Sequence, residues 1–247
     1  MLLNADNIWV FYVLLPIVSF LYASVGHGGA SGYLALMSLF SFAPEIMKPT
    51  ALLLNLFVAG ISFYYYYKAG YFNKKLFLPF AISSIPLAFL GGNIAVDASI
   101  YKKILAVLLV FAILKMLNLF GNDTHKIKQV KLWQGLLIGS IIGFFSGLIG
   151  IGGGIILTPI ILLLHWGNMK EAAAVSALFI WVNSAAGLFG QISSGVTIQK
   201  EAFILVMVAL VGGVLGGYLG SKKLNNQKLR YILAFVLAIA CFKLFLT

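Results

Sequence analysis

The stretch "GHGGA" at residues 26–30 interrupts an apolar part of the chain, and "GIGGG" at residues 150–154 repeats it. In a lipid bilayer every backbone N–H group needs a hydrogen-bond partner. A non-helical glycine run at membrane depth is therefore stable only where protein buries it or where it lines a cavity. If the surrounding segments lie in a membrane, these two stretches predict two helix breaks of the same kind.

The composition indicates a membrane protein. Of the 247 residues 62% are hydrophobic and 9% are charged, and the mean hydropathy is +1.03, whereas soluble domains carry about 25% charged residues. Apolar runs of the length that crosses a bilayer core of about 30 Å recur along the whole chain. The net charge of +11 lies in short loops, where lysine and arginine set orientation. We therefore predict a lipid bilayer as partner and exclude nucleic acid.

Further matches extend the repeat beyond the glycine runs. Gly70 matches Gly195, and the pair Gly91-Gly92 matches Gly216-Gly217, at nearly the same offset as the glycine runs. We predict an all-α integral membrane protein with one transporter domain, residues 1–247, made of repeat 1 (8–120), a linker (121–132) and repeat 2 (133–247). Each repeat has about four full-length transmembrane helices and one short helix. The expected segments are 8–25, 29–42 (short), 49–67, 76–94, 102–120, 133–150, 154–166 (short), 172–191, 202–220 and 229–247.

Loop charges indicate that the two repeats are inverted. Loop 68–75 is lysine-rich, whereas its counterpart 192–201 carries only Lys200 as a basic residue; the bias reverses between loops 95–101 and 221–228. Placing loops 68–75 and 221–228 inside puts most of the 17 Lys and Arg residues on the inner side, as the positive-inside rule prefers. Inverted repeats that contain broken helices are common in secondary transporters.

The glycine breaks are the candidate substrate site. Each short helix begins just after its glycine run, so its unpaired N–H groups and the positive end of its dipole favour an anion. We predict one anion between the two breaks and expect no metal and no cofactor. The candidate substrate-binding residues are Gly26, His27, Gly28, Gly29, Ser31, Gly150, Gly152, Gly153, Gly154 and Asn183.

Polar side chains near the breaks have two interpretations each. His27 either packs against a carbonyl or contacts substrate or protons. Asn55, Ser184 and Thr50, on the helices after the breaks, either bridge helices or line a pathway, and bridging is favoured. Asn183 is included in the site because we expect it to cluster with Trp181 and Ser184 opposite the second break.

Glycines at every fourth position predict two flat helix faces. One face carries Gly135, Gly139, Gly143 and Gly147, and the other carries Gly212, Gly216 and Gly220. Such spacing is typical of close helix packing in membranes.

With these motifs the sequence resembles the TauE/SafE family of sulfite and organosulfonate exporters. The resemblance rests on the two glycine breaks, on "GLIGIGGGIILTP" at residues 147–159, on Lys170-Glu171-Ala172 and on the duplicated layout. It implies export of a sulfur-containing or small organic anion. We expect the inner or plasma membrane, because the sequence shows no recognisable organelle-targeting extension. The first repeat departs from the second motif, with His27 in place of Ile151 and Ala30 in place of Gly154.

The expected spans hold no Asp or Glu well inside, so we predict no carboxylate proton relay.

Two rival functions are weighed against the transporter. Residues 29–32 read "GASG", as around the serine of rhomboid intramembrane proteases, so Ser31 could be a nucleophile. A protease needs a histidine on another membrane helix, which neither His125 nor His165 offers, and it leaves the duplication unexplained. The other rival is a membrane subunit of a larger complex. We predict a transporter rather than an enzyme.

Overall fold

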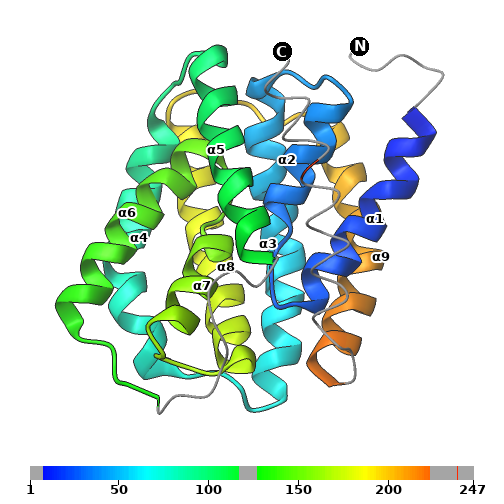
Figure 1. Ribbon diagram of the computed structural model, residues 1–247. Coiled ribbons are helices and arrows are strands. Elements are labelled where there is room, and N and C mark those ends of the chain that lie inside the picture. The colour runs from blue at the N-terminus through cyan, green and yellow to red at the C-terminus, as the bar shows by residue number, and fades with distance from the viewer. Residues whose placement is uncertain (1–7, 117–126, 223–237, 239–247) are drawn as a thin grey trace.

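A computed structural model describes residues 8–116, 127–222 and 238, and its described residues form helices and no strands (Figure 1). The helices are α1 (Ile8–Ser24), α2 (Ala30–Leu39), α3 (Pro44–Lys68), α4 (Lys74–Asn93), α5 (Ala98–Met116), α6 (Leu132–Ile149), α7 (Gly154–Leu163), α8 (Met169–Ser193) and α9 (Glu201–Lys222). The expected segment 229–247 lies outside the described residues, Ala238 excepted. The all-helical prediction is confirmed for the part of the chain that the structure describes.

Helix length separates the helices that can cross a membrane from those that cannot. Within the described residues five helices are long and apolar enough to span a bilayer, namely α3, α4, α6, α8 and α9. By contrast α2 and α7 have 10 residues each, or about 15 Å at 1.5 Å per residue. Both are too short for a core of about 30 Å, which confirms the two predicted short helices.

The two longest helices begin earlier than predicted. Both α3 and α8 have 25 residues, whereas the expected segments were 49–67 and 172–191. Pro44 starts α3 at a first-turn position where the missing N–H costs nothing, so that Pro49 lies inside the helix. Asn168 caps α8 by accepting from the N–H groups of Lys170 and Glu171, at 3.0 Å each.

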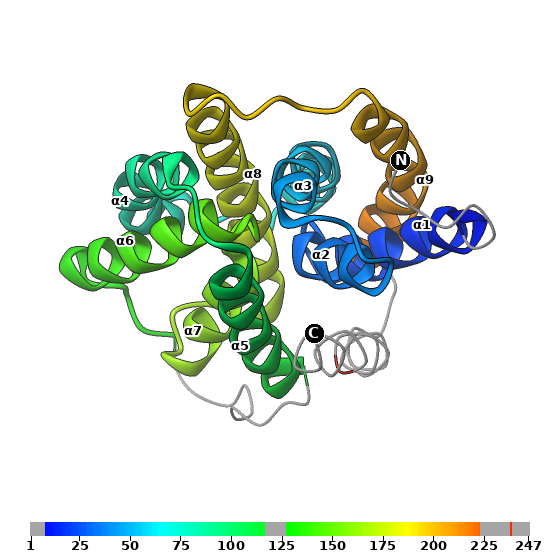
Figure 2. The same ribbon diagram turned by 90° about the horizontal axis from the view of Figure 1, so that it is seen from above.

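The packing pairs helices from the two halves of the chain. The helices α3 and α8 pack together in the middle of the molecule, α1 packs on α9, and α4 packs on α6 (Figure 2). In Figure 1 α3 runs downward and α8 runs upward. Consistent with this, the ammonium of Lys170 at the start of α8 lies 5.5 Å from the ring of Tyr66 at the end of α3. Each half is thus packed mainly against the other.

The predicted glycine faces pack against backbone. A Cβ built on Gly139, Gly143 or Gly147 of α6 would strike a carbonyl oxygen of α4, and one on Gly212, Gly216 or Gly220 of α9 would strike a carbonyl oxygen of α1. The backbones of these helix pairs therefore touch. This confirms the prediction of close packing at both faces.

Replacement of Gly147 by leucine is expected to prevent folding. Its Cβ would overlap the carbonyl oxygen of Ala88 on α4, and overpacking that backbone must absorb costs more than the about 1–3 kcal/mol of an ordinary core insertion. The measurement is the yield of monodisperse protein in detergent by size-exclusion chromatography. Ile141→Leu on the exposed face of α6 is the control. A normal yield of Gly147→Leu would contradict the packing described.

Candidate functional site

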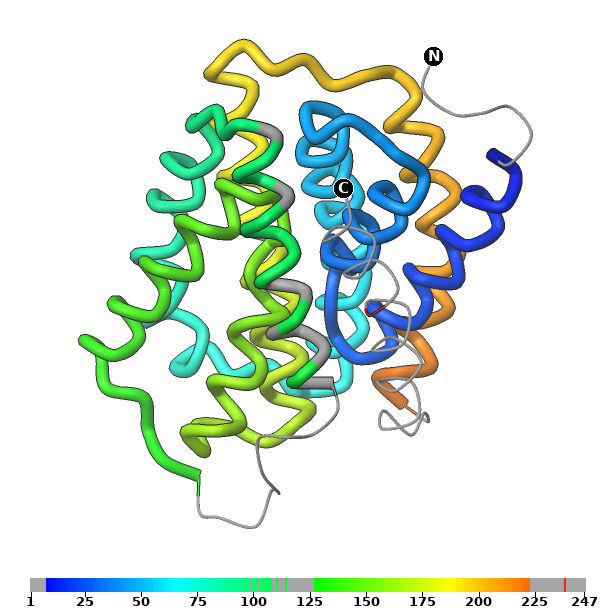
Figure 3. The backbone as a smooth tube through the Cα atoms, turned by 45° about the horizontal axis from the view of Figure 1, so that its top comes forward, coloured from blue at the N-terminus to red at the C-terminus, as the bar shows by residue number. Residues whose placement is uncertain are grey.

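The chain leaves helical geometry at two glycine breaks, defined as residues 25–29 between α1 and α2 and residues 150–153 between α6 and α7 (Figure 3). Gly29 precedes α2 with φ +103° and Gly153 precedes α7 with φ +77°, and neither cap has a side-chain hydrogen bond. Only glycine adopts such left-handed angles without strain. The glycines therefore allow α1 and α6 to end and the short helices to start at a sharp angle.

The two breaks approach each other on opposite sides of one asparagine and one isoleucine. A Cβ built on Gly28 would lie 2.5 Å from Oδ1 of Asn55 and 2.8 Å from Cγ2 of Ile180. A Cβ built on Gly152 would lie 2.5 Å from Nδ2 of Asn55 and 2.8 Å from the same Cγ2. Asn55 on α3 and Ile180 on α8 are separated by the same offset as Gly70 and Gly195. The breaks therefore meet near the middle of the α3 and α8 pair.

Asn55 joins the two halves by hydrogen bonds. Its Oδ1 accepts from the N–H of Ala30, the first residue of α2, at 3.0 Å. Its Nδ2 donates to Oγ of Ser184 on α8 at 3.1 Å. Asn55 and Ser184 are fully buried. The prediction that these polar residues bridge helices is confirmed for both.

His27 links the first break to the second short helix. Its Nδ1 lies 3.0 Å from the carbonyl oxygen of Val25, which can only accept, so Nδ1 carries a proton. Its Nε2 lies 3.2 Å from Oγ1 of Thr158 on α7. The Thr158 hydroxyl in turn contacts Oγ of Ser176 at 2.7 Å and the carbonyl oxygen of Gly154 at 3.0 Å. Because a hydroxyl both donates and accepts, Thr158 can serve either charge state of the imidazole.

Two buried polar atoms flank the second break without a hydrogen-bond partner among the described residues. These are Oδ1 of Asn183 and Oγ of Ser146. A Cβ on Gly153 would lie 3.5 Å from Cβ of Ser146 and 2.9 Å from the ring of Phe179. The backbone carbonyl oxygen of Phe179 accepts a hydrogen bond from Nδ2 of Asn183 at 2.8 Å. Unpaired buried polar atoms are costly. Ser146 lies next to Gly153, whereas Asn183 is connected to it through Phe179.

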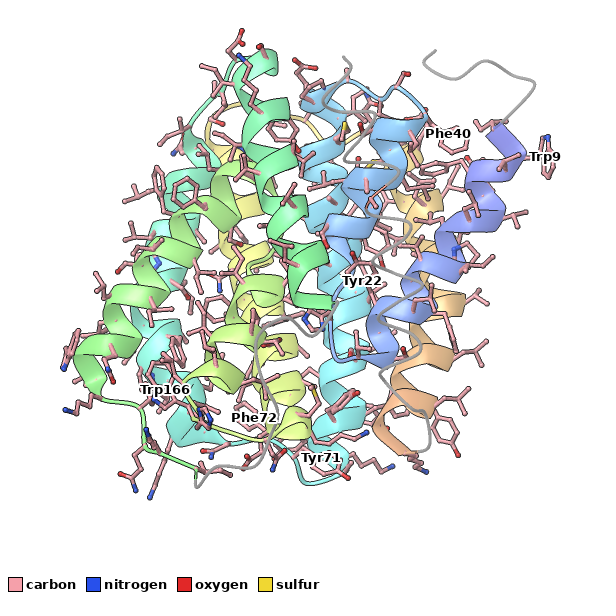
Figure 4. All side chains as sticks on the ribbon, in the orientation of Figure 1. Trp9, Tyr22, Phe40, Tyr71, Phe72 and Trp166 are labelled. Atoms are coloured by element: carbon pink, nitrogen blue, oxygen red, sulfur yellow. The ribbon has the colours of Figure 1, made fainter. Side chains whose placement is uncertain are left out.

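Other residues predicted at or near the site have different neighbours. The hydroxyl of Ser31 donates to the hydroxyl of Tyr22, labelled in Figure 4, at 2.9 Å. The structure separates Trp181 from the expected cluster with Asn183, because Trp181 is 42% exposed and lines an apolar groove with Phe89 and Phe189. Gly26 packs against Ala173, and Gly150 packs against Lys48. The centre of the site is therefore formed by Gly28, Gly152 and their neighbours.

Sequence reasoning missed four residues that shape the site, namely Ser146, Thr158, Ser176 and Ile180. Thr158 lies within the quoted stretch 147–159, but its contact with His27 joins residues 131 apart in the chain. The signal for Ile180 was available, since the repeat offset pairs it with Asn55. Ser146 and Ser176 are small and buried, and nothing in the pattern distinguishes them from packing serines.

Comparison with known proteins places this architecture in a family. A sequence model described as "Sulfite exporter TauE/SafE" matches residues 12–244. The chain belongs to the TauE/SafE family. This confirms the resemblance based on the two glycine breaks and the duplicated layout.

Relatives within the TauE/SafE family are described as membrane transporters. A probable membrane transporter protein of Sinorhizobium fredii is 34% identical over 92% of this chain and 94% of its own length. Relatives with the same description in Methanocaldococcus jannaschii and Bacillus subtilis are 28% and 27% identical, over 72% and 79% of this chain and 71% and 79% of their own lengths. No solved structure matches the chain. The protein is therefore a membrane transporter and not an enzyme, which removes the protease reading of Ser31.

Proposed function

We propose that this protein is a secondary transporter that moves a small anion, a sulfur oxyanion or an organosulfonate, by alternating access around a central site between the two glycine breaks. The observation that carries the proposal is that breaks 124 residues apart along the chain meet at the Asn55 side chain. A helix break buried in a membrane protein is tolerated where it binds something or moves. The description of the family as sulfite exporters suggests the substrate class.

The proposed architecture is one domain, residues 1–247, of two inverted repeats. Three observations support it: α3 and α8 are antiparallel, equivalent helices α1 and α6 pack on equivalent helices α9 and α4, and the short helices α2 and α7 follow equivalent breaks. Symmetry of this kind provides two arrangements of similar free energy, one open to each side. We propose that the transporter works in the inner or plasma membrane.

An anion suits the chemistry of the proposed site. The substrate-binding residues would be those predicted from the sequence, with backbone N–H groups near Gly28, Gly29, Gly153 and Gly154 as donors and His27 and Asn183 as side-chain contacts. Among the buried polar side chains of the described residues none is a carboxylate. An anion would therefore meet donors and helix N-termini rather than a buried negative charge.

Export of an anion needs no coupled ion under this proposal. A membrane potential of 100 mV, negative inside, is worth about 2.3 kcal/mol for each charge that leaves. Concentrative import would need a coupled cation. Uniport outward is the simplest mechanism that these features support.

The described conformation would be a closed one. His27 is 5% exposed, and Gly28 has no room for even one added methyl group beside Asn55, Ile180 and Ala59. An anion could reach the breaks only when α2 or α7 moves away from the α3 and α8 pair. The Asn55 and His27 hydrogen bonds to the two short helices are the contacts that such a movement would exchange.

The proposal is tested by measuring the thermal midpoint of the purified protein in detergent with and without each anion. A ligand that binds only the folded state raises the apparent stability. The anions would be sulfite, thiosulfate, sulfate, small organosulfonates and carboxylates. We expect a concentration-dependent rise with a sulfur oxyanion or a sulfonate. No rise with any of these anions would contradict the proposed substrate class.

Replacement of His27 by alanine is expected to weaken anion binding and to change the pH dependence of transport. The imidazole is the titratable group that links the first break to Thr158, and histidine changes charge near neutral pH. The measurement is sulfite flux in proteoliposomes at several pH values. Thr158→Val, which removes the hydroxyl partner but keeps the imidazole, is the matched variant. If the flux of His27→Ala equals the wild-type flux at every pH, His27 has only a packing role.

A further inference from the structure

A separate cavity opens at the end of the molecule where α3 begins and where α4 and α8 end. Its volume is about 190 Å³, and its lining includes Glu45, Lys48, Tyr101, Gln191 and Ser194. The cavity adjoins the second glycine break, because a Cβ on Gly150 would lie 3.1 Å from Cγ of Lys48. It is therefore positioned as a mouth on the path from one membrane surface to the breaks.

Gln191, which lines this cavity, has a buried and unpaired side-chain amide. Its side chain is 1% exposed, and neither Oε1 nor Nε2 has a hydrogen-bond partner among the described residues. Four hydrogen bonds are possible for an amide of this kind. A buried amide without any of them is unfavourable unless a guest in the cavity supplies partners.

Lys48 supplies positive charge to the lining of the same cavity. Its ammonium lies 3.5 Å from the carbonyl oxygen of Gly92 and 3.4 Å from that of Ile94. These distances are at the long limit for hydrogen bonds and leave the ammonium weakly held. The acidic residue of the lining, Glu45, is exposed, whereas Lys48 is half-buried. Solvent screens an exposed charge more than a half-buried one, so the charge of Lys48 counts for more in the cavity than that of Glu45.

Lys170, near the start of α8, shows how closely the protein can hold a lysine at a helix end. Lys170 donates to the carbonyl oxygen of Gly220 at the end of α9 at 2.7 Å. Its ammonium also lies 5.5 Å and 5.8 Å from the rings of Tyr66 and Tyr71. Lys170 is thus closely held by helix-end carbonyls and aromatic faces. Lys48 makes longer contacts with its carbonyl oxygens and lines the same cavity as Gln191.

We propose that Lys48 and Gln191 form a second anion site, at one mouth of the transport path, that takes a small oxyanion. The site rests on the proposed function, since its ligand is the anion that passes to or from the glycine breaks. The ammonium supplies the charge and Nε2 of Gln191 donates a hydrogen bond, while Oε1 accepts from a protonated oxyanion or from its hydration water. The hydroxyl of Tyr101 is already engaged, because it donates to the carbonyl oxygen of Ile149 at 3.1 Å.

Binding to the second site is measured in Gly153→Val, a variant in which the central site is blocked. The probe is sulfite, which replaces gluconate at constant ionic strength, and the readout is the thermal midpoint of delipidated protein in detergent. We expect Gly153→Val to keep a sulfite-dependent rise, Gly153→Val/Lys48→Met to lose it, and Gly153→Val/Lys48→Arg to keep part of it. Lys200→Met, which removes an exposed charge outside the cavity lining, is the matched control and leaves the rise unchanged.

Moving the charge within the cavity distinguishes binding from a structural role of Lys48. The exchange Lys48→Gln/Gln191→Lys keeps one cation and one amide in the cavity, so it should regain sulfite dependence that Lys48→Gln loses. If Gly153→Val does not fold, the same comparison is made in the wild-type background. In that background Lys48→Met should lower kcat/KM for sulfite transport about tenfold. The thermal midpoint measured without sulfite should stay unchanged. The exchange Lys48→Gln/Gln191→Lys should restore kcat/KM.

Three results would overturn the second site. One is a sulfite-dependent rise that Lys48→Met leaves intact in the Gly153→Val background. Another is the absence of any rise in folded Gly153→Val. The third is a Lys48-dependent rise with added phosphatidylglycerol and none with sulfite, which would assign the cavity to a lipid headgroup. A different result would be that the wild-type protein does not transport sulfite but still shows a Lys48-dependent rise of the thermal midpoint with sulfite. That result would contradict the proposed function but not the second site.

Discussion

Gly153→Val is expected to reduce anion transport to the level of liposomes without protein. Valine is strained at the φ of +77° that Gly153 adopts, because its branched side chain disfavours left-handed angles. Its Cβ would also lie 2.6 Å from Cγ2 of Ile142 and 2.9 Å from Cε1 of Phe179. The start of α7 or its neighbours Ile142 and Phe179 must then shift, which changes the second break. The measurement is sulfite flux in proteoliposomes that contain matched amounts of inserted protein.

Gly195→Val is the matched control for Gly153→Val. Gly195 has a similar φ of +89°, but a Cβ there meets nothing within 4 Å. The control therefore carries the backbone strain without the steric clash and lies in the loop between α8 and α9. We expect it to transport at a rate close to wild type. Unchanged flux in Gly153→Val would contradict the assignment of the substrate to the glycine breaks.

Asn55→Leu is expected to abolish transport and to lower the thermal midpoint by several degrees. Leucine has nearly the same size but leaves the N–H of Ala30 and the hydroxyl of Ser184 without the partners that lie at 3.0 Å and 3.1 Å. Each buried group left unpaired costs about 1–3 kcal/mol. The first break also loses its hydrogen bond to α3. Thermal unfolding and sulfite flux are measured on the same preparation.

Ser19→Ala separates loss of stability from loss of function in this experiment. The hydroxyl of Ser19 on α1 donates to the carbonyl oxygen of Ala209 on α9 at 2.7 Å, so its loss removes a buried contact between helices but leaves the Asn55 hydrogen bonds intact. We expect a lower midpoint with transport retained. Equal loss of transport in Ser19→Ala and Asn55→Leu would indicate that Asn55 acts only through stability.

The parts of the fold that follow from local pattern could be predicted from the sequence. Apolar run length predicts the positions of the helices, and glycine interruptions predict the short α2 and α7. Glycine at every fourth position predicts contact faces because such residues lie on one side of a helix. The start of α3 was wrong by five residues, since Pro49 resembles a helix start and the better start, Pro44, precedes it.

The parts of the site that depend on contacts between the halves could not be predicted. Trp181 was grouped with Asn183 because they are close in sequence, but residues two apart on a helix do not face each other. The contacts of His27 with Thr158 and of Lys48 with Gly150 depend on how α7 and α3 pack against the breaks. No periodicity encodes such a contact. The second anion site was missed for the same reason, since Lys48 and Gln191 lie on different helices.

The central claim, that a small anion crosses the membrane between the two glycine breaks, is tested most directly by sulfite efflux from proteoliposomes under an imposed potential. Vesicles loaded with sulfite receive a potassium diffusion potential that is negative inside. We expect efflux that requires the protein, increases with the potential and is absent in Gly153→Val. Correctly folded wild-type protein that releases neither sulfite nor an organosulfonate at any potential, or equal efflux from Gly153→Val, would contradict it.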